Sequence, residues 1–141
     1  MMKKLISLIL TICMLCVSLG TIACAEAASV TRDSKYFTSY GTTLSKVGGG
    51  TIKIIFSTDA TQVADTLGVV SYQVFRRNSS NEWVECSGLL SGKTASNVGS
   101  YTFSKYFYGI SGETYRVTAT FVCTIDGKTE YKNYTSLYIE T

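Results

Sequence analysis

The chain has 141 residues, no histidine and a formal net charge of +3. This length is that of one small domain, and the absence of an imidazole excludes Ser-His-Asp and Cys-His catalysis and histidine-ligated zinc. A charge this small does not favour nucleic acid or an anionic membrane as a partner.

Residues 1–28 have the composition of an export signal. Two lysines precede an apolar run over residues 5–22, and alanines in small-x-small spacing follow as far as Ala27. We predict a signal helix over 1–28 that is removed, leaving one secreted, extracellular domain over 29–141 with no membrane contact. The alternatives are an uncleaved membrane anchor and a lipid attached to Cys24. Either would hold the protein at the cell surface.

The first three predicted strands cover residues 36–47, 51–57 and 69–77. Each alternates apolar or β-branched residues with polar ones, which is the period of a strand with one face in a core. We expect the first strand to lie at a sheet edge. Glycines at 48–50 allow the positive φ angles of a tight hairpin. Val and Leu four residues apart within 59–68 predict a short helical turn that closes one end of the fold.

Four more strands are predicted over residues 82–86, 101–110, 115–125 and 129–140. The stretch 87–100 is rich in Gly, Ser and Thr, so we predict a long mobile loop there. The strand over 115–125 has the longest alternation, which places it at the centre of a sheet. Asp126-Gly127 after it is a strong hairpin signal. The pattern predicts an all-β, antiparallel, seven-stranded β-sandwich.

The sequence contains no proline, a residue that often protects the exposed edges of β-sheets. Lysine can serve the same purpose, because a charge on an edge strand discourages pairing with another chain. We expect this role of Lys46, Lys53, Lys128 and Lys132.

The segment from Ile110 to Val117, Ile-Ser-Gly-Glu-Thr-Tyr-Arg-Val, resembles the Leu-x-Pro-Gly-x-x-Tyr-x-Val signature of fibronectin type III domains. Residues 72–77, followed by 82–84, resemble the third and fourth strands of the same domains. The resemblance implies an immunoglobulin-like sandwich in which the ring of Tyr115 lies in the core and its hydroxyl binds the main chain at a corner. The whole chain also resembles a family of small secreted Gram-positive proteins of unknown function, which implies no activity.

Two cysteines, Cys86 and Cys123, lie outside the predicted signal. Export makes a disulfide between them possible. The resemblance implies that a third strand separates theirs, so that the Cα atoms lie roughly 10 Å apart, or about two strand spacings. A disulfide requires about 7 Å or less. We therefore favour two separate buried thiols and keep the bridge as the alternative.

Neither catalysis nor a bound cofactor is predicted. A hydrolase that uses carboxylates alone needs two acids about 5 to 10 Å apart in a cleft, and the acids of this chain mostly fall at predicted strand ends and turns. Asp59 and Asp65 have the right ligand type for calcium, but their spacing matches no calcium loop. We predict no enzyme, no catalytic residue, no cofactor and no metal site.

The aromatic residues are the main functional signal. Ten Tyr, six Phe and one Trp exceed what so small a core must bury. Cross-strand pairing on exposed sheet faces is one explanation, and a contact surface is the other, because tyrosine gives large area at small entropic cost. The candidates for such a surface are Tyr101, Tyr106, Tyr108, Tyr134 and Tyr138.

These observations predict a secreted, non-catalytic binding module whose partner is an unknown extracellular protein or glycan. A structural protein that associates through its edge strands is the alternative, and a carboxylate-dependent hydrolase is the least favoured class.

Overall fold

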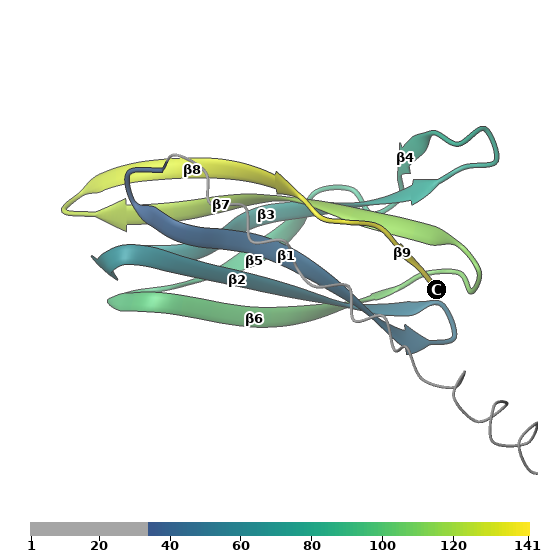
Figure 1. Cartoon of the computed structure of the whole chain (residues 1–141), viewed down its shortest axis with the longest axis horizontal. Helices are drawn as coiled ribbons and strands as arrows, with labels where there is room; N and C mark the ends of the chain where they lie inside the picture. Colours follow the sequence, from purple (N-terminus) through teal and green to yellow (C-terminus); the bar gives the residue numbers. More distant parts are fainter. Residues whose placement is uncertain (1–33) are drawn as a thin grey trace, which may run out of the picture.

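The computed structural model describes residues 34–141, in which two antiparallel sheets pack face to face (Figure 1). The predicted signal over 1–28 lies outside the described residues. Sheet A has the order β1-β2-β6 and consists of β1 (Phe37–Gly48), β2 (Thr51–Ala64) and β6 (Val98–Tyr108). Sheet B has the order β4-β3-β7-β8, with β5 paired to β3 and β9 paired to β7.

The six strands of sheet B are β3 (Thr66–Arg77), β4 (Trp83–Glu85), β5 (Leu90–Ala95), β7 (Thr114–Ile125), β8 (Lys128–Thr135) and β9 (Ile139–Glu140). The predicted all-β, antiparallel architecture is confirmed, but the described chain has nine strands, so the predicted number of seven is wrong. One added strand comes from the division of the predicted last strand into β8 and β9. There Ser136 interrupts the ladder, and its hydroxyl accepts the Val117 N–H at 2.9 Å.

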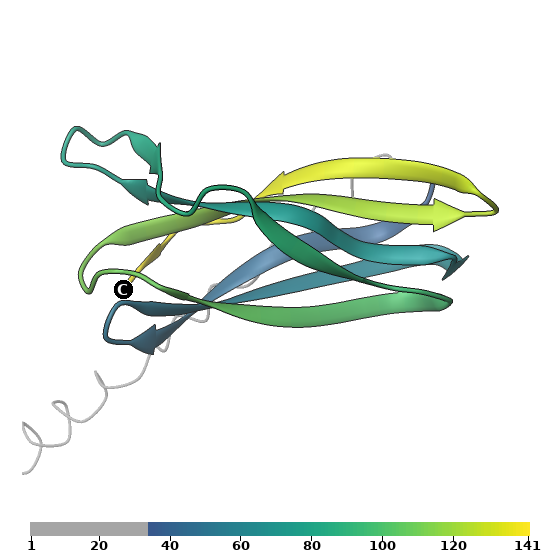
Figure 2. The same cartoon turned by 180° about the vertical axis from the view of Figure 1, so that it is seen from behind.

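The other added strand is β5, which lies inside the predicted loop over 87–100. The prediction of a mobile loop is wrong because β5 pairs with β3, from Leu67 opposite Ala95 to Tyr72 opposite Leu90. Figure 2 shows this green strand crossing the side of the sandwich between the two sheets. A Cβ at Gly92 would lie 2.2 Å from the Val69 carbonyl oxygen, so only glycine permits this approach. The Gly- and Ser-rich composition therefore reflects close packing.

The helical turn predicted over 59–68 is also wrong. β2 continues to Ala64, and a single residue, Asp65, separates it from β3. The Asp65 N–H donates to the Thr124 carbonyl at 2.8 Å, and its carboxylate accepts the Gly127 N–H at 3.2 Å. These bonds fix a sharp corner at which the chain passes from sheet A to sheet B. The apolar residues at this corner do not share a helix face, because Val63 is exposed and Leu67 is buried.

The core lies between the sheets, and β7 is its central strand, as predicted. Its inward residues, which are all buried, are Tyr115, Val117, Ala119, Phe121, Cys123 and Ile125. The predicted inward residues of β2 are buried as well, namely Ile52, Ile54 and Phe56. The alternation fails at Val70, which is exposed while Val69 is buried, because a β-bulge lies between Val69 and Ser71.

Turns and a corner behave as predicted. Gly49 and Gly50 connect β1 to β2, and Asp126 and Gly127 have φ angles of 50° and 70° between β7 and β8, the positive values that a two-residue hairpin requires. The Tyr115 ring is buried, and its hydroxyl accepts the Ile110 N–H at 2.7 Å. The expected bond between this tyrosine and the main chain is therefore confirmed.

Candidate functional site

The five tyrosines predicted to form a surface lie in three different places. Tyr106 and Tyr108 are exposed on the outer face of sheet A, where Tyr106 is opposite Lys53. Tyr101 and Tyr134 are half-buried and pack against the core. Tyr138 is exposed beside sheet B. The predicted residues therefore do not form one continuous surface.

Tyr138 belongs to a cluster of rings and arginines on the outer face of sheet B. We call this cluster, made of Phe75, Arg77, Trp83, Arg116 and Tyr138, the Trp83 face. The Arg116 guanidinium carbon lies 4.4 Å from the Trp83 ring centroid and 5.7 Å from that of Phe75. The Arg77 guanidinium is 5.9 Å from the Trp83 centroid, and the Tyr138 ring is 6.4 Å from it. All these distances fit cation–π or ring–ring contact.

Strand register explains how the cluster forms. Phe75 on β3 is opposite Arg116 on β7, and Arg77 on β3 is opposite Trp83 on β4. Directly opposed residues share a sheet face, so these four side chains meet on one side. The β3–β4 hairpin is held at its turn by Asn78, whose side-chain oxygen accepts the Glu82 N–H at 2.8 Å. The short strand β4 thus carries Trp83 back over β3.

The two arginines of the Trp83 face have no acidic partner. Within residues 34–141 neither Arg77 nor Arg116 forms an ion pair, and the Nε of each is buried without a hydrogen-bond acceptor. Glu85 opposite Phe75 and Glu140 opposite Thr114 mark the border of the same face. Leaving a buried donor unsatisfied costs about 1–3 kcal/mol. The face therefore combines aromatic rings with two guanidiniums that form no ion pair, although Glu85 and Glu140 lie on the same side of the sheet.

A row of hydroxyl and amide side chains continues this face along β7 and β8. Thr118 and Thr135 hydroxyls lie 3.1 Å apart, and the Thr120 hydroxyl donates to the Asn133 side chain at 2.9 Å. On β3, Gln73 is opposite Thr118. Because alternate residues of a strand share one face, this polar row lies on the same side of sheet B as Arg116.

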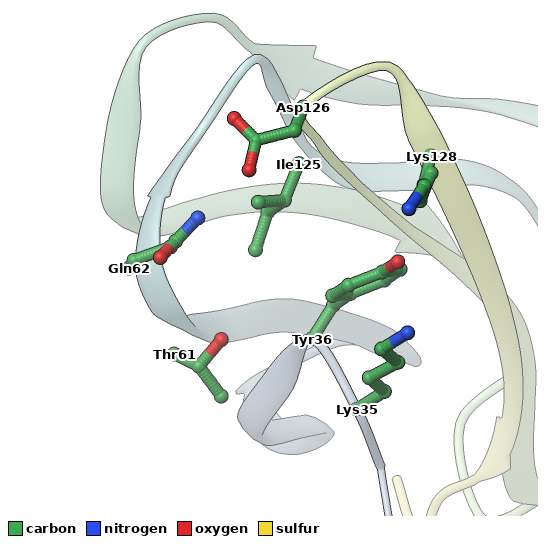
Figure 3. Close-up of a pocket in the computed structure, with 7 residues that line it drawn as sticks. All are labelled: Lys35, Tyr36, Thr61, Gln62, Ile125, Asp126 and Lys128. Atoms are coloured by element: carbon green, nitrogen blue, oxygen red, sulfur yellow. The ribbon is translucent and has the colours of Figure 1, made fainter.

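A separate pocket of about 270 Å³ opens at another end of the sandwich (Figure 3). It is lined by Lys35, Tyr36, Thr61, Gln62, Ile125, Asp126 and Lys128. The Lys35 ammonium lies 5.4 Å from the centroid of the Tyr36 ring. Asp126 is the one acid that lines the pocket, so this pocket does not bring together the two carboxylates that hydrolysis would require.

Glu130 on β8 connects the beginning of the described chain to sheet B. Its carboxylate accepts the Ser34 hydroxyl at 2.9 Å and the Tyr36 N–H at 3.0 Å, and it pairs with the Lys132 ammonium at 3.0 Å. Burial by itself would raise the pKa of Glu130, but these hydrogen bonds and the Lys132 charge outweigh it and lower the pKa below its ordinary value. Glu130 therefore acts as an ionised clamp between β8 and the segment before β1.

Cys86 and Cys123 are free thiols at different levels of sheet B. Cys86 donates its N–H to Val74, whereas Cys123 is opposite Leu67. Val74 and Leu67 are seven residues apart on β3, about 23 Å in an extended strand. The expectation that both thiols are buried is wrong for Cys86, which is exposed because β4 is short and ends before it; Cys123 is buried.

The chain over residues 34–141 contains no group of three or more potential metal-ligating side chains, and it has no helix of the length and apolarity that crossing a bilayer requires. Asp59 accepts a hydrogen bond from the Ser39 hydroxyl, and Asp65 accepts one from Gly127. Each of the two carboxylates considered for calcium thus has a bond in the fold.

Sequence reasoning missed four of the five members of the Trp83 face, namely Phe75, Arg77, Trp83 and Arg116. Arg116 is 33 positions from Trp83 in the printed sequence, and only the register of β3 with β7 brings them together. One local signal was present: Arg77 and Trp83 flank the polar turn over 78–81, which places them opposite each other in a hairpin.

Comparison with known proteins gives no family for the chain. No family model matches it, and no curated protein matches it. A solved crystal structure of a protein from Archaeoglobus fulgidus has 12% sequence identity, covering 74% of this chain and 97% of that one, with a TM-score of 0.39. This likeness is too low to carry an argument about fold or function.

Proposed function

We propose that the protein is a secreted, non-catalytic binding module of the immunoglobulin or fibronectin type III kind, which acts at or outside the cell surface. In this proposal the ligand is bound on the Trp83 face. The observation that carries it is the stacking of Arg116 on Trp83 at 4.4 Å, with no acidic side chain of residues 34–141 paired to that arginine.

Energetics support a recognition role for this face. Trp, Tyr and Arg are the residues that most often dominate binding energy at interfaces, and the Trp83 face contains all three. Tyr138 retains 65% of its exposure although it lies against Trp83. A ligand that covered Tyr138 would remove this apolar area from water and could supply the acceptors that Arg77 and Arg116 lack.

The two rival classes have less support. A hydrolase based on carboxylates would require facing acids in a cleft, and the pocket in Figure 3 offers one acid. Self-association would require edge strands that accept another strand. Two of the edge strands instead place a lysine on the inner side of their sheet, since Lys105 is opposite buried Ile54 and Lys132 is opposite buried Phe121.

The test compares Trp83→Ala with the double variant Tyr106→Ala/Tyr108→Ala. Protein is purified after expression of the full chain, and binding to cell-wall material and to a glycan array is measured. Trp83→Ala should weaken binding by about 30-fold or more, the effect of a 2 kcal/mol hot spot.

The double variant is the matched control, because it removes two exposed rings from the opposite sheet. It should bind as the unmodified protein does, and circular dichroism should show the same β-structure in both variants. Binding that survives Trp83→Ala, or that is lost only in the double variant, would contradict the proposed site. Absence of binding by the unmodified protein to all wall and glycan samples would contradict a glycan or wall ligand.

A further inference from the structure

We infer that the ligand of the Trp83 face is an acidic polysaccharide, a chain of sugar rings that carries carboxylates. This inference rests on the proposed function and names the ligand class of the same site. Three features of the face point to it: guanidiniums without an ion pair, an exposed tyrosine ring beside them, and a row of hydroxyl and amide groups that continues along the sheet.

The guanidiniums indicate the charge of the ligand. Arg116 stacks on Trp83, Arg77 lies within cation–π distance of the same ring, and neither has an ion-pair partner among the described residues. A guanidinium is planar and presents donors that match the two oxygens of a carboxylate. Contact with the ring restricts each guanidinium, so less conformational freedom is lost when an anion binds. The ligand chemistry that best satisfies this pair is therefore a carboxylate.

The rings and the polar row indicate a sugar chain. Tyr138 presents exposed ring area beside the half-buried Trp83 and the charges, and stacking on such a ring suits the apolar faces of sugars. Beyond Arg116, Thr118 and Thr120 follow on the same face at a spacing of about 7 Å per two residues. Their hydroxyls interact with Thr135 and Asn133 and retain capacity for further hydrogen bonds. An extended, hydroxyl-rich polymer can use rings, charges and hydroxyls along one flat face.

The same geometry disfavours an acidic peptide. Extended peptides commonly bind by adding a strand to a sheet edge, where free backbone groups are available. Most of the Trp83 face lies over β3 and β7, which are paired with each other and each with a further strand on its other side. Trp83 itself lies on β4, an edge strand of three residues, which is too short to offer much backbone to an added strand. The backbone groups of β3 and β7 are used within the sheet, so over these two strands the face offers side chains. A side-chain surface of rings, arginines and hydroxyls fits a polysaccharide better than an extended peptide, whose backbone N–H and C=O groups would need hydrogen-bond partners.

The experiment uses the intrinsic fluorescence of Trp83, because the chain contains one tryptophan and it lies in the site. Protein purified after expression of the full chain is titrated with polygalacturonate, alginate and hyaluronate. Each polymer is compared with its methyl-esterified form, which keeps the sugar backbone and removes the charge. Poly-glutamate serves as the acidic polymer without sugar rings. We expect at least one acidic polysaccharide to change the fluorescence and to bind about tenfold or more tightly than its ester and than poly-glutamate.

Substitutions of single charged residues test whether the acidic polysaccharide binds on the Trp83 face. Arg116→Gln should weaken binding of the acidic polysaccharide about tenfold or more, and Arg116→Lys should recover only part of it, because lysine lacks the planar stack. Lys53→Gln is the matched control, since it removes one positive charge on the outer face of sheet A. It should leave binding unchanged. Glu85→Gln should strengthen binding, because it removes a carboxylate from the border of the Trp83 face.

The outcomes separate this inference from the proposed function. Equal binding of the esters, or equal binding of poly-glutamate, would overturn the acidic polysaccharide as ligand. No response to any of the three acidic polysaccharides would overturn it as well. In each case, wall or glycan binding that Trp83→Ala abolishes would still support the proposed function. If the unmodified protein binds neither these polymers nor any wall or glycan sample, both proposals fail.

Discussion

At the scale of single residues, one tyrosine fixes a corner of the sandwich. The Tyr115 ring lies in the core and its hydroxyl reaches back to accept the Ile110 N–H at 2.7 Å. Gly109 is part of the arrangement, because a Cβ there would lie 2.7 Å from the Tyr115 hydroxyl oxygen. The bond thus joins the beginning of the β6–β7 connection, just after β6, to the first residues of β7.

Removal of this hydroxyl has a defined expected effect. Tyr115→Phe keeps the buried ring and leaves the Ile110 N–H without its acceptor. We expect the free energy of unfolding to fall by about 1–1.5 kcal/mol, as measured by chemical denaturation. Tyr131→Phe is the control at an exposed tyrosine and should change stability by less than about 0.5 kcal/mol. Equal stability of Tyr115→Phe and the unmodified protein would show that the bond contributes nothing.

The two thiols should differ in reactivity. Burial raises the pKa of the Cys123 thiol to about 11, with a smaller contribution from the Glu130 charge, and the thiolate is the reactive form. Cys86 is exposed. Native protein titrated with a chromogenic thiol reagent should therefore expose one reactive thiol from this pair, at Cys86, and a second only after unfolding. A native, unreduced protein in which neither thiol reacts even after unfolding would instead indicate the disulfide.

At the scale of elements, the edge strands share one feature, a lysine on the inner side of the sheet. Four of them place a lysine opposite a buried core residue, so that the lysine starts on the inner side of the sheet. The pairs are Lys46 with Ile52 on β1, Lys93 with Val69 on β5, Lys105 with Ile54 on β6, and Lys132 with Phe121 on β8. Inward charges of this kind discourage pairing of an edge with another molecule.

Lys105→Val tests this feature on β6. The substitution gives the edge strand a continuous apolar inner face, so we expect stronger concentration-dependent association than that of the unmodified protein. Size-exclusion chromatography with light scattering measures it. Ser104→Val, the neighbouring residue on the outer side of the same strand, should have a much smaller effect. A Lys105→Val variant that stays monomeric at all concentrations would contradict a protective role for this lysine.

Elements also show what can be predicted from sequence. The inward sides of β2 and β7 followed directly from period-two alternation, because both strands lie in the middle of a sheet with one face in the core. The turn at Asp126-Gly127 followed from local φ requirements. β5 and the corner at Asp65 did not, because both depend on contacts with distant strands. Lys128 on β8 is a fifth lysine on the inner side of an edge strand, since it is opposite buried Ile125. Three of the five, Lys46, Lys128 and Lys132, were expected. Lys53 instead lies on the central strand β2.

The candidate site was harder to predict than the fold. Exposed tyrosines were expected, and Tyr106, Tyr108 and Tyr138 are exposed, but the cluster around Trp83 depends on registers between β3, β4 and β7. Composition gives the number of rings and not which of them meet. Arg116 looked like an ordinary outward residue of a strand, and its contact with Trp83 became visible only with the strand order.

For the whole molecule, the pH dependence of stability should be simple. The chain has no histidine, the residue whose ordinary pKa gives charge changes between pH 5 and 8. Glu130 has a pKa lowered in the folded state from its ordinary value of 4.5. A group of this kind contributes stability above its unfolded pKa and loses that contribution as pH falls through its folded pKa. We expect thermal stability to vary little between pH 5 and 8 and to fall below about pH 4.5.

Glu130→Gln measures how much of the pH-dependent stability comes from this one carboxylate. The variant should be less stable than the unmodified protein at pH 7, and the difference between the two melting temperatures should shrink on acidification below pH 4.5. Differential scanning calorimetry across the pH range gives both values. The control is Glu82→Gln, at the exposed turn between β3 and β4, which should follow the unmodified protein more closely. A difference that is constant with pH would exclude the clamp as its source.

The Glu130 clamp also gives the molecule a direction. Ser34 is bonded to Glu130 close to the β7–β8 hairpin, whereas β4, the strand that carries Trp83, lies at the other end of the long axis (Figure 1). The 12 residues of β7 span about 40 Å between these ends. If the chain before Ser34 holds the protein at a cell surface, the long axis of the domain separates the point of attachment from the Trp83 face. The end with Trp83 would then be the part of the domain farthest from the surface and the first to meet ligands in the surrounding medium.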